Sequence, residues 1–149
     1  MGQTIFKAEE FEPSKYKTAQ EKADFANRLV RFIDSGFEKR FFTKKLYNDL
    51  YINFSMIAHY NHHGFWDYYF EGSGEKLDFT QDLLNAKAYG DPTHTNSDVE
   101  KAVQQWMYKN RILDREIYNH ESVMETAELT EYKRLQQKYG TIKNYDLEI

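Results

Sequence analysis

The feature that most constrains the fold is a long stretch, residues 97–139, that contains neither glycine nor proline. Because these two residues are the strongest helix breakers, their absence favours continuous helix. Apolar and small polar residues recur in it at alternating steps of four and three, the spacing of a heptad seam. We therefore expect one long helix, or two nearly continuous helices with a bend near residues 120–128. The seam comprises Val99, Val103, Trp106, Asn110, Leu113, Ile117, His120, Met124 and Ala127.

The start and the length of this segment add two expectations. Ser97 and Glu100 have the spacing of a capping box, which predicts that a helix begins there. A helix of about 30 residues is about 45 Å long, longer than a small domain is wide, so part of it must project or meet another chain. Asn110 falls at an a position, where a buried amide selects register and oligomer state. A homodimer through residues 99–127 is therefore one prediction.

Two further helices are indicated earlier in the chain. Thr18 and Glu21 form a capping box that starts a helix ending at Ser35-Gly36. A second helix is expected from Thr43 as N-cap to Gly64, which would be its C′ residue. The apolar stripes of the two helices are Phe25, Leu29, Phe32 and Ile33, and then Leu46, Leu50, Phe54 and Ile57.

The remaining segments have weaker signals. Residues 1–17 are expected to form an irregular arm, and residues 65–79 either a short aromatic helix or a small hairpin turning at residues 72–74. A short helix is expected near residues 80–89, before Gly90. No run alternates in the manner of a strand. The sequence thus predicts one mainly α domain over residues 1–149, a helical bundle with a long C-terminal helix.

Charge and composition limit the classes of function. The net charge is -4, yet residues 15–48 carry nine Lys/Arg against four Asp/Glu, whereas residues 66–131 carry fourteen Asp/Glu against six basic residues. The chain has no cysteine, which excludes disulfides and thiolate chemistry and suits a reducing compartment. No apolar run approaches the ~20 residues that span a bilayer. We expect a cytoplasmic protein without a membrane segment.

The stretch HYNHHGFWDYYF, residues 59–70, is crowded with histidines and aromatic rings. If the helix from residue 44 persists to its end, His59 and His63 lie one turn apart, the i, i+4 geometry by which helices hold a metal. This spacing predicts a metal-dependent hydrolase as one alternative. The competing interpretation is that these imidazoles occupy the last turn of a helix and hydrogen-bond its free carbonyls. No glutamate stands in the pattern that a metallohydrolase helix requires, so we favour the helix-end interpretation.

The basic stretch EKRFFTKKLY suggests a different alternative, nucleic-acid binding. Lys39, Arg40, Lys44 and Lys45 surround two phenylalanines, and cations with exposed rings are what single-stranded nucleic acid needs. A sequence pI near 5.7 argues against a general nucleic-acid binder. Burial of the two rings between helices is the simpler interpretation.

No phosphate-binding loop, dinucleotide fingerprint, nucleophile elbow or cofactor-binding pattern occurs, so the sequence predicts neither an enzyme nor a cofactor. Tyrosine and tryptophan are favoured at protein interfaces. We therefore predict a small acidic interaction protein that binds a partner protein with a basic surface. Such a protein could act as an inhibitor or modulator of a nucleic-acid-handling complex. The residues expected to meet the partner are Lys39, Arg40, Lys44, Lys45, Trp66, Tyr68, Tyr69, Trp106 and Asn110.

Overall fold

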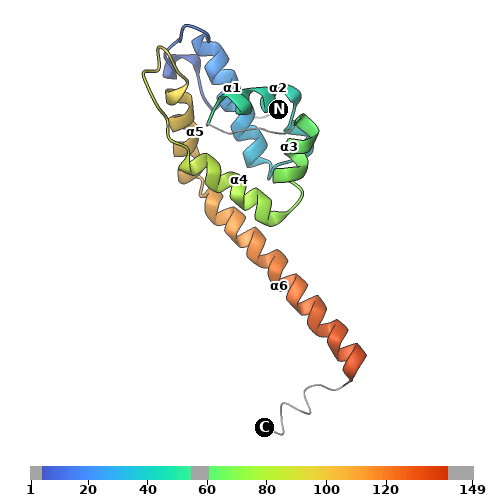
Figure 1. Cartoon of the computed structure of the whole chain (residues 1–149). Coiled ribbons are helices and arrows are strands. Elements are labelled where there is room, and N and C mark those ends of the chain that lie inside the picture. The colour runs from blue at the N-terminus through green and yellow to red at the C-terminus, as the bar shows by residue number, and fades with distance from the viewer. Residues whose placement is uncertain (1–4, 55–60, 141–149) are drawn as a thin grey trace.

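The computed structural model describes residues 5–54 and 61–140, and in this part of the chain the regular structure is all helix, without a strand. Five α-helices form a compact body, and the sixth starts beneath it and extends away as a single rod (Figure 1). The mainly α bundle with a long C-terminal helix is therefore confirmed. The elements are η1 Ala8–Glu10, α1 Ala19–Asp34, η2 Lys39–Phe41, α2 Lys44–Ile52, α3 His62–Tyr69, α4 Ser73–Asn85, α5 Ser97–Lys109 and α6 Ile112–Tyr139.

Helix α1 is the central element of the body and agrees with the sequence. The Thr18 hydroxyl accepts a hydrogen bond from Glu21 N at 3.1 Å, and the Glu21 carboxylate accepts one from Thr18 N at 2.9 Å. The predicted apolar face is buried, and Phe32 and Ile33 are completely covered. The arm before α1 is packed on it, because the Asn27 side chain bonds the backbone N–H and C=O groups of Phe6.

The predicted second helix is wrong in its length. It begins after Thr43 as expected but ends at Ile52, with Asn53 extended as its C-cap. Phe54 then adopts a left-handed φ of 62°, and its N–H donates to Glu100 Oε1 at 2.9 Å. This tertiary hydrogen bond stabilises the break, which a local pattern cannot reveal. Leu46, Leu50 and Phe54 are buried as expected, whereas Ile57 lies outside the described residues.

A new helix, α3, starts where the second one was expected to end. Asn61 is its N-cap, and the Asn61 side chain accepts a hydrogen bond from Gly64 N at 2.7 Å. Gly64 is therefore a first-turn residue and not a C′ residue. His62 and His63 open the helix rather than close it, so the prediction that they occupy a last turn is wrong.

The hairpin considered for residues 65–79 is also wrong. Residues 62–69 and 73–85 form α3 and α4, joined through Gly72, which is the N-cap of α4. The turn between the two helices lets rings from both meet: Phe65, Phe70 and Phe79 are buried, and the Phe70 and Phe79 centroids are 4.8 Å apart. This aromatic packing stabilises the helical pair.

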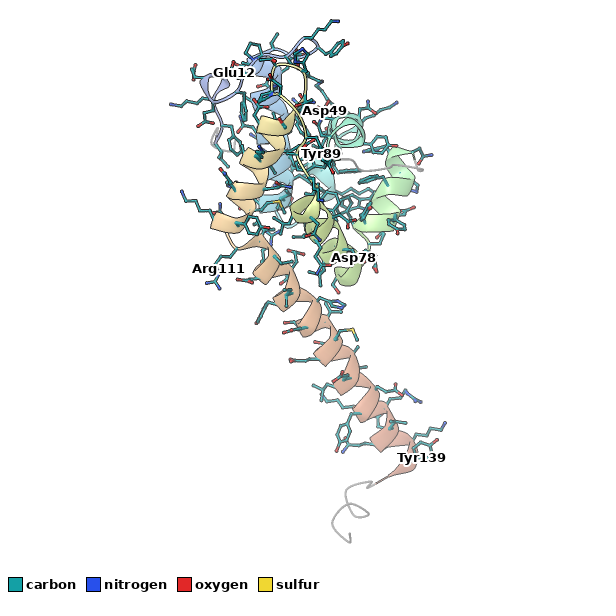
Figure 2. All side chains as sticks on the ribbon, turned by 60° about the vertical axis from the view of Figure 1, so that its left-hand side comes forward. Glu12, Asp49, Asp78, Tyr89, Arg111 and Tyr139 are labelled. Atoms are coloured by element: carbon teal, nitrogen blue, oxygen red, sulfur yellow. The ribbon has the colours of Figure 1, made fainter. Side chains whose placement is uncertain are left out.

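The C-terminal segment contains a break that the heptad pattern did not predict. Helix α5 ends at Lys109, and Arg111 has a left-handed φ of 54° before α6 begins at Ile112. The predicted bend near residues 120–128 is wrong, because the turn lies at residues 110–111. The turn directs Ile112 into the core, where it is 2% exposed. Figure 2 shows Arg111 at the junction of the two helices.

The capping box proposed for Ser97 and Glu100 does not form. Asn96 is the N-cap of α5, and the Ser97 hydroxyl is buried and donates to Gly90 O at 3.0 Å. The Glu100 carboxylate instead accepts from Phe54 N. Both side chains serve tertiary contacts in place of the local cap.

Within the described ranges, none of the helices combines the length and the apolar character needed to cross a bilayer.

Candidate partner-binding surfaces

His62 is part of the aromatic core. Its ring stacks on Phe42 with a centroid distance of 4.9 Å and an interplanar angle of 9°, and its Nε2 lies 2.7 Å from Phe42 O. A ring nitrogen with that backbone carbonyl as its partner acts as the donor. His62 therefore ties α3 to Phe42, the C-cap of η2, and its carbonyl partner does not belong to its own helix.

The described residues give no geometric support to the metal site predicted at His59 and His63. His63 Nε2 lies 3.1 Å from Asp67 Oδ2, an exposed i, i+4 pair at the surface of α3. His59 lies outside the described residues, so its distance from His63 is not defined. Among the residues that are described, no three His, Cys, Asp or Glu side chains gather in a way that could hold a metal ion.

The basic stretch is divided between core and surface. Phe42 is 3% exposed, and Trp66 is 7% exposed beneath Lys39, whose Nζ lies 5.6 Å from the Trp66 ring centroid. Arg40 lies over the half-buried Phe41 ring at 4.5 Å and pairs with Glu38 at 2.6 Å. The rings that nucleic acid would stack on are thus largely buried or covered. Trp66 is a core residue, which corrects its assignment to an open binding face; Lys44 and Lys45 are exposed at the start of α2.

Trp106 and Asn110 occupy different environments. Trp106 is half-buried and lines a shallow hollow of about 400 Å³ between α5 and the N-terminal arm, together with Phe6 and Phe11. Asn110 is exposed and caps α5, because its Nδ2 donates to Trp106 O at 2.8 Å. Asn110 is therefore the C-cap of α5, at the break between α5 and α6. Val99 and Val103 are buried within their own chain, so the first part of the 99–127 seam is already covered.

A second hollow lies between α3 and α4, and its lining is the most distinctive feature of the surface. It has a volume of about 560 Å³ and is lined by Asp67, Tyr68, Tyr69, Glu75, Asp78 and Asp82. We call it the acidic hollow. All six side chains belong to helices whose other faces pack on the aromatic core, so the lining is held by rigid elements. Asp78 lies on α4 at the side of the body from which α6 departs (Figure 2).

The charges in the acidic hollow are partly shielded from water. Desolvation raises the pKa of Asp82, and the neighbouring charge of Asp78 raises it further, although the hydrogen bond from Tyr69 opposes both. Burial and the charge of Asp82 raise the pKa of Tyr69 to about 12. The Tyr69 hydroxyl donates to Asp82 Oδ2 at 3.4 Å. Because the ionised form of Asp82 is disfavoured in the hollow, a cationic group bound there would stabilise it.

The third surface is the projecting part of α6. Ser73 Oγ of α4 lies 2.8 Å from His120 Nδ1, which marks the end of the packed section. Beyond His120, the side-chain hydrogen bonds of the described helix stay within it, as between Arg134 and Glu131 at 2.6 Å. Val123, Met124, Leu129, Tyr132 and Tyr139 are between 48% and 61% exposed there. This helix extends far from the body (Figure 1).

The acidic hollow was only partly predicted from the sequence. Tyr68 and Tyr69 were expected to meet a partner, and they do lie together at the surface. The four carboxylates beside them were missed, because they come from two helices whose angle is set by buried rings. The available signal was Asp78 and Asp82, an i, i+4 pair on α4, and such pairs are usually solvated. Comparisons of the chain with protein-family models, with curated proteins and with solved structures found no match.

Proposed function

We propose that this chain is a small interaction protein that binds a basic partner protein through the acidic hollow. The observation that carries the proposal is the lining of that hollow, four carboxylates and two tyrosine rings around about 560 Å³. Lysine and arginine side chains are attracted both to carboxylates and to the faces of aromatic rings. Tyrosine is also enriched at protein interfaces, where it offers a rigid apolar body with one polar group.

The charge distribution supports a partner of opposite sign. Acidic residues predominate from residue 66 to residue 131, and the hollow concentrates four of them on α3 and α4. A field of one sign steers a complementary partner and raises the association rate. One concrete form of this function is an inhibitor or modulator that occupies a basic groove meant for nucleic acid.

The absence of cysteine favours a reducing compartment, and we place this activity in the cytoplasm.

The proposal is tested with a defined basic probe. A fluorescein-labelled hexa-arginine peptide is titrated with the protein at about 50 mM and 200 mM salt, and fluorescence anisotropy reports binding. We expect saturable binding that weakens with salt, and no binding of a hexa-glutamate peptide. The double variant Asp78→Asn/Asp82→Asn should weaken binding by about tenfold or more, since it removes two charges from the hollow.

The matched control removes two charges elsewhere. Glu9 and Asp24 are exposed carboxylates on η1 and α1, and Glu9→Gln/Asp24→Asn changes the net charge by the same amount. We expect this variant to bind the peptide within about threefold of the unmodified chain. If the unmodified chain does not bind hexa-arginine at the lower salt, or if both variants lose binding equally, the proposal is wrong.

A further inference from the structure

One side of α6 carries exposed aromatic and apolar side chains, with polar residues between them. Tyr118, Leu129, Tyr132 and Tyr139 are 70%, 53%, 49% and 61% exposed. At 100° per residue they lie on one side of the helix, roughly opposite the buried Ile112 and Glu116. With the intervening Ser122, Glu125 and Gln136 they follow alternating steps of four and three. We call these seven residues the outer stripe.

The outer stripe is also a heptad seam, distinct from the one that the sequence suggested through residues 99–127. A seam of this spacing lets a second helix pack along the whole length without drifting off the face. A row of large exposed apolar side chains is unusual on a helix that meets only water, and such rows often mark an interaction site. A helix is also stabilised mainly by packing its apolar face on another element, and little by propensity alone. The projecting part, residues 121–139, is about 28 Å long.

The charges of the projecting part are separated along its length. Residues 121–131 contain four glutamates and no basic residue, whereas residues 132–139 contain Lys133, Arg134 and Lys138 and no acidic residue. Two such helices side by side and parallel would place the four glutamates of each copy next to those of the other. An antiparallel pair would place the acidic part of each copy beside the basic part of its neighbour.

We infer that the occupant of the outer stripe is a second copy of this chain, paired antiparallel through residues 122–139. The two-fold axis passes near Thr130, which puts Leu129 of one copy beside Tyr132 of the other and Glu125 beside Gln136. The interface is isologous, so the same patch serves both copies and the assembly closes as a dimer. The two bodies then lie at opposite ends of the paired helices. This surface is separate from the acidic hollow, so the inference does not depend on the proposed function.

Cysteine cross-linking tests the direction of pairing, and the natural chain offers a clean background because it has no cysteine. Glu125→Cys and Gln136→Cys variants are oxidised separately and as an equimolar mixture, and covalent dimers are separated on a non-reducing gel. Antiparallel pairing predicts efficient cross-linking in the mixture and little in either variant alone. Efficient cross-linking of each variant with itself would show parallel pairing and overturn the inference, as would the absence of any cross-link.

A solution measurement tests the stripe itself. Leu129 and Val123 are both 53% exposed, but Val123 lies on the opposite side of α6 from the outer stripe. Light scattering and sedimentation equilibrium of the full chain should give a dimer mass at tens of micromolar concentration. Leu129→Asp should raise the dimer dissociation constant by about tenfold or more, and Val123→Asp by less than about threefold.

Both variants keep the body intact, since neither side chain is buried in it, and circular dichroism should report the same thermal unfolding for the body. A monomeric unmodified chain over the whole concentration range would overturn the inference. If the two aspartate variants weakened the dimer equally, the assignment to the outer stripe would be wrong. The effect of the added charge would then not depend on which side of α6 carries it.

Discussion

Lys22 illustrates how a single charged residue can organise the body. Its side chain is completely buried, and its ammonium donates to Pro92 O at 2.8 Å, to Thr95 O at 3.0 Å and to Asp98 Oδ1 at 3.0 Å. All three donor positions of the ammonium are therefore used. These bonds connect α1, the loop after α4 and the first turn of α5. A buried charge is tolerated only when it is paired and fully hydrogen-bonded, and Lys22 meets that condition.

Replacing this residue should be costly. Lys22→Met leaves two carbonyls and the Asp98 carboxylate without the ammonium, and we expect the free energy of unfolding to fall by about 3–5 kcal/mol. Urea denaturation followed by circular dichroism measures the change. Lys101→Met, at an exposed position of α5, should change stability by less than about 0.5 kcal/mol. A loss below about 1 kcal/mol in the Lys22 variant would contradict the structural role assigned here.

Asp82 presents the opposite case, a charge that weakens the folded state. Its pKa in the fold is raised above 3.8 by desolvation and by Asp78, so the ionised form is disfavoured there. The stability contribution of such a group is greatest below the unfolded pKa and is lost as the pH rises through the folded pKa. Ionised Asp82 therefore lowers stability at neutral pH, which is consistent with the binding role proposed for the acidic hollow.

Asp82→Asn should reveal this cost. At pH 7 we expect the variant to be as stable as the unmodified chain or more stable, by up to about 0.5 kcal/mol after solvent screening. The difference should disappear as the pH falls below 3.8, where the carboxyl is protonated in both states. Urea unfolding at pH 7, 5 and 3.5 gives the comparison. A clear loss of stability at pH 7 would show that the carboxylate supports the fold.

At the scale of elements, short polar caps determine where helices begin. Thr18, Thr43 and Asn61 each accept a backbone N–H three residues on, at the starts of α1, α2 and α3. These hydrogen bonds satisfy donors that a helix leaves free in its first turn. Two of the three caps were predicted from the sequence. Asn61 was not, because the pattern of apolar residues appeared to continue through it.

The cap of the central helix gives the clearest prediction at this scale. Thr18→Ala removes both the side-chain acceptor and the reciprocal bond geometry of the capping box, and we expect a loss of about 1 kcal/mol in the free energy of unfolding. Thr126→Ala is the matched control, because the Thr126 hydroxyl donates to Ser122 O on the exposed part of α6. That change should stay within about 0.5 kcal/mol. Equal losses in chemical denaturation would contradict the capping role.

At the scale of the whole molecule, the described residues divide into a body with its own core and a helix that leaves it. The buried core residues run from Phe6 to Ile112, and none of the residues from 121 to 139 is buried. The body therefore owes little of its stability to the projecting part. The two proposed binding surfaces thus lie one on the body and one on the projecting part of α6.

A shortened chain tests this division. A variant that ends at His120 keeps Ile112 and Glu116, the buried residues of α6. We expect its body to unfold within about 2 °C of the full chain when both are monomeric, as measured by scanning calorimetry. Its mass in solution should be that of a monomer. A strongly lowered unfolding temperature would show that residues 121–149 contribute to the body.

The helical class, the start and buried face of α1, and a C-terminal helix too long for the body could all be predicted from the sequence alone. These features depend on periodicity and capping, which involve residues close together in the sequence. Only the tertiary structure decided where α2 and α5 end, because Phe54 is held by Glu100 and Ile112 is turned into a distant core. It also decided that His62 stacks on the aromatic core and that four carboxylates from α3 and α4 share one hollow. Contacts between residues far apart in sequence leave no local pattern from which these features could be read.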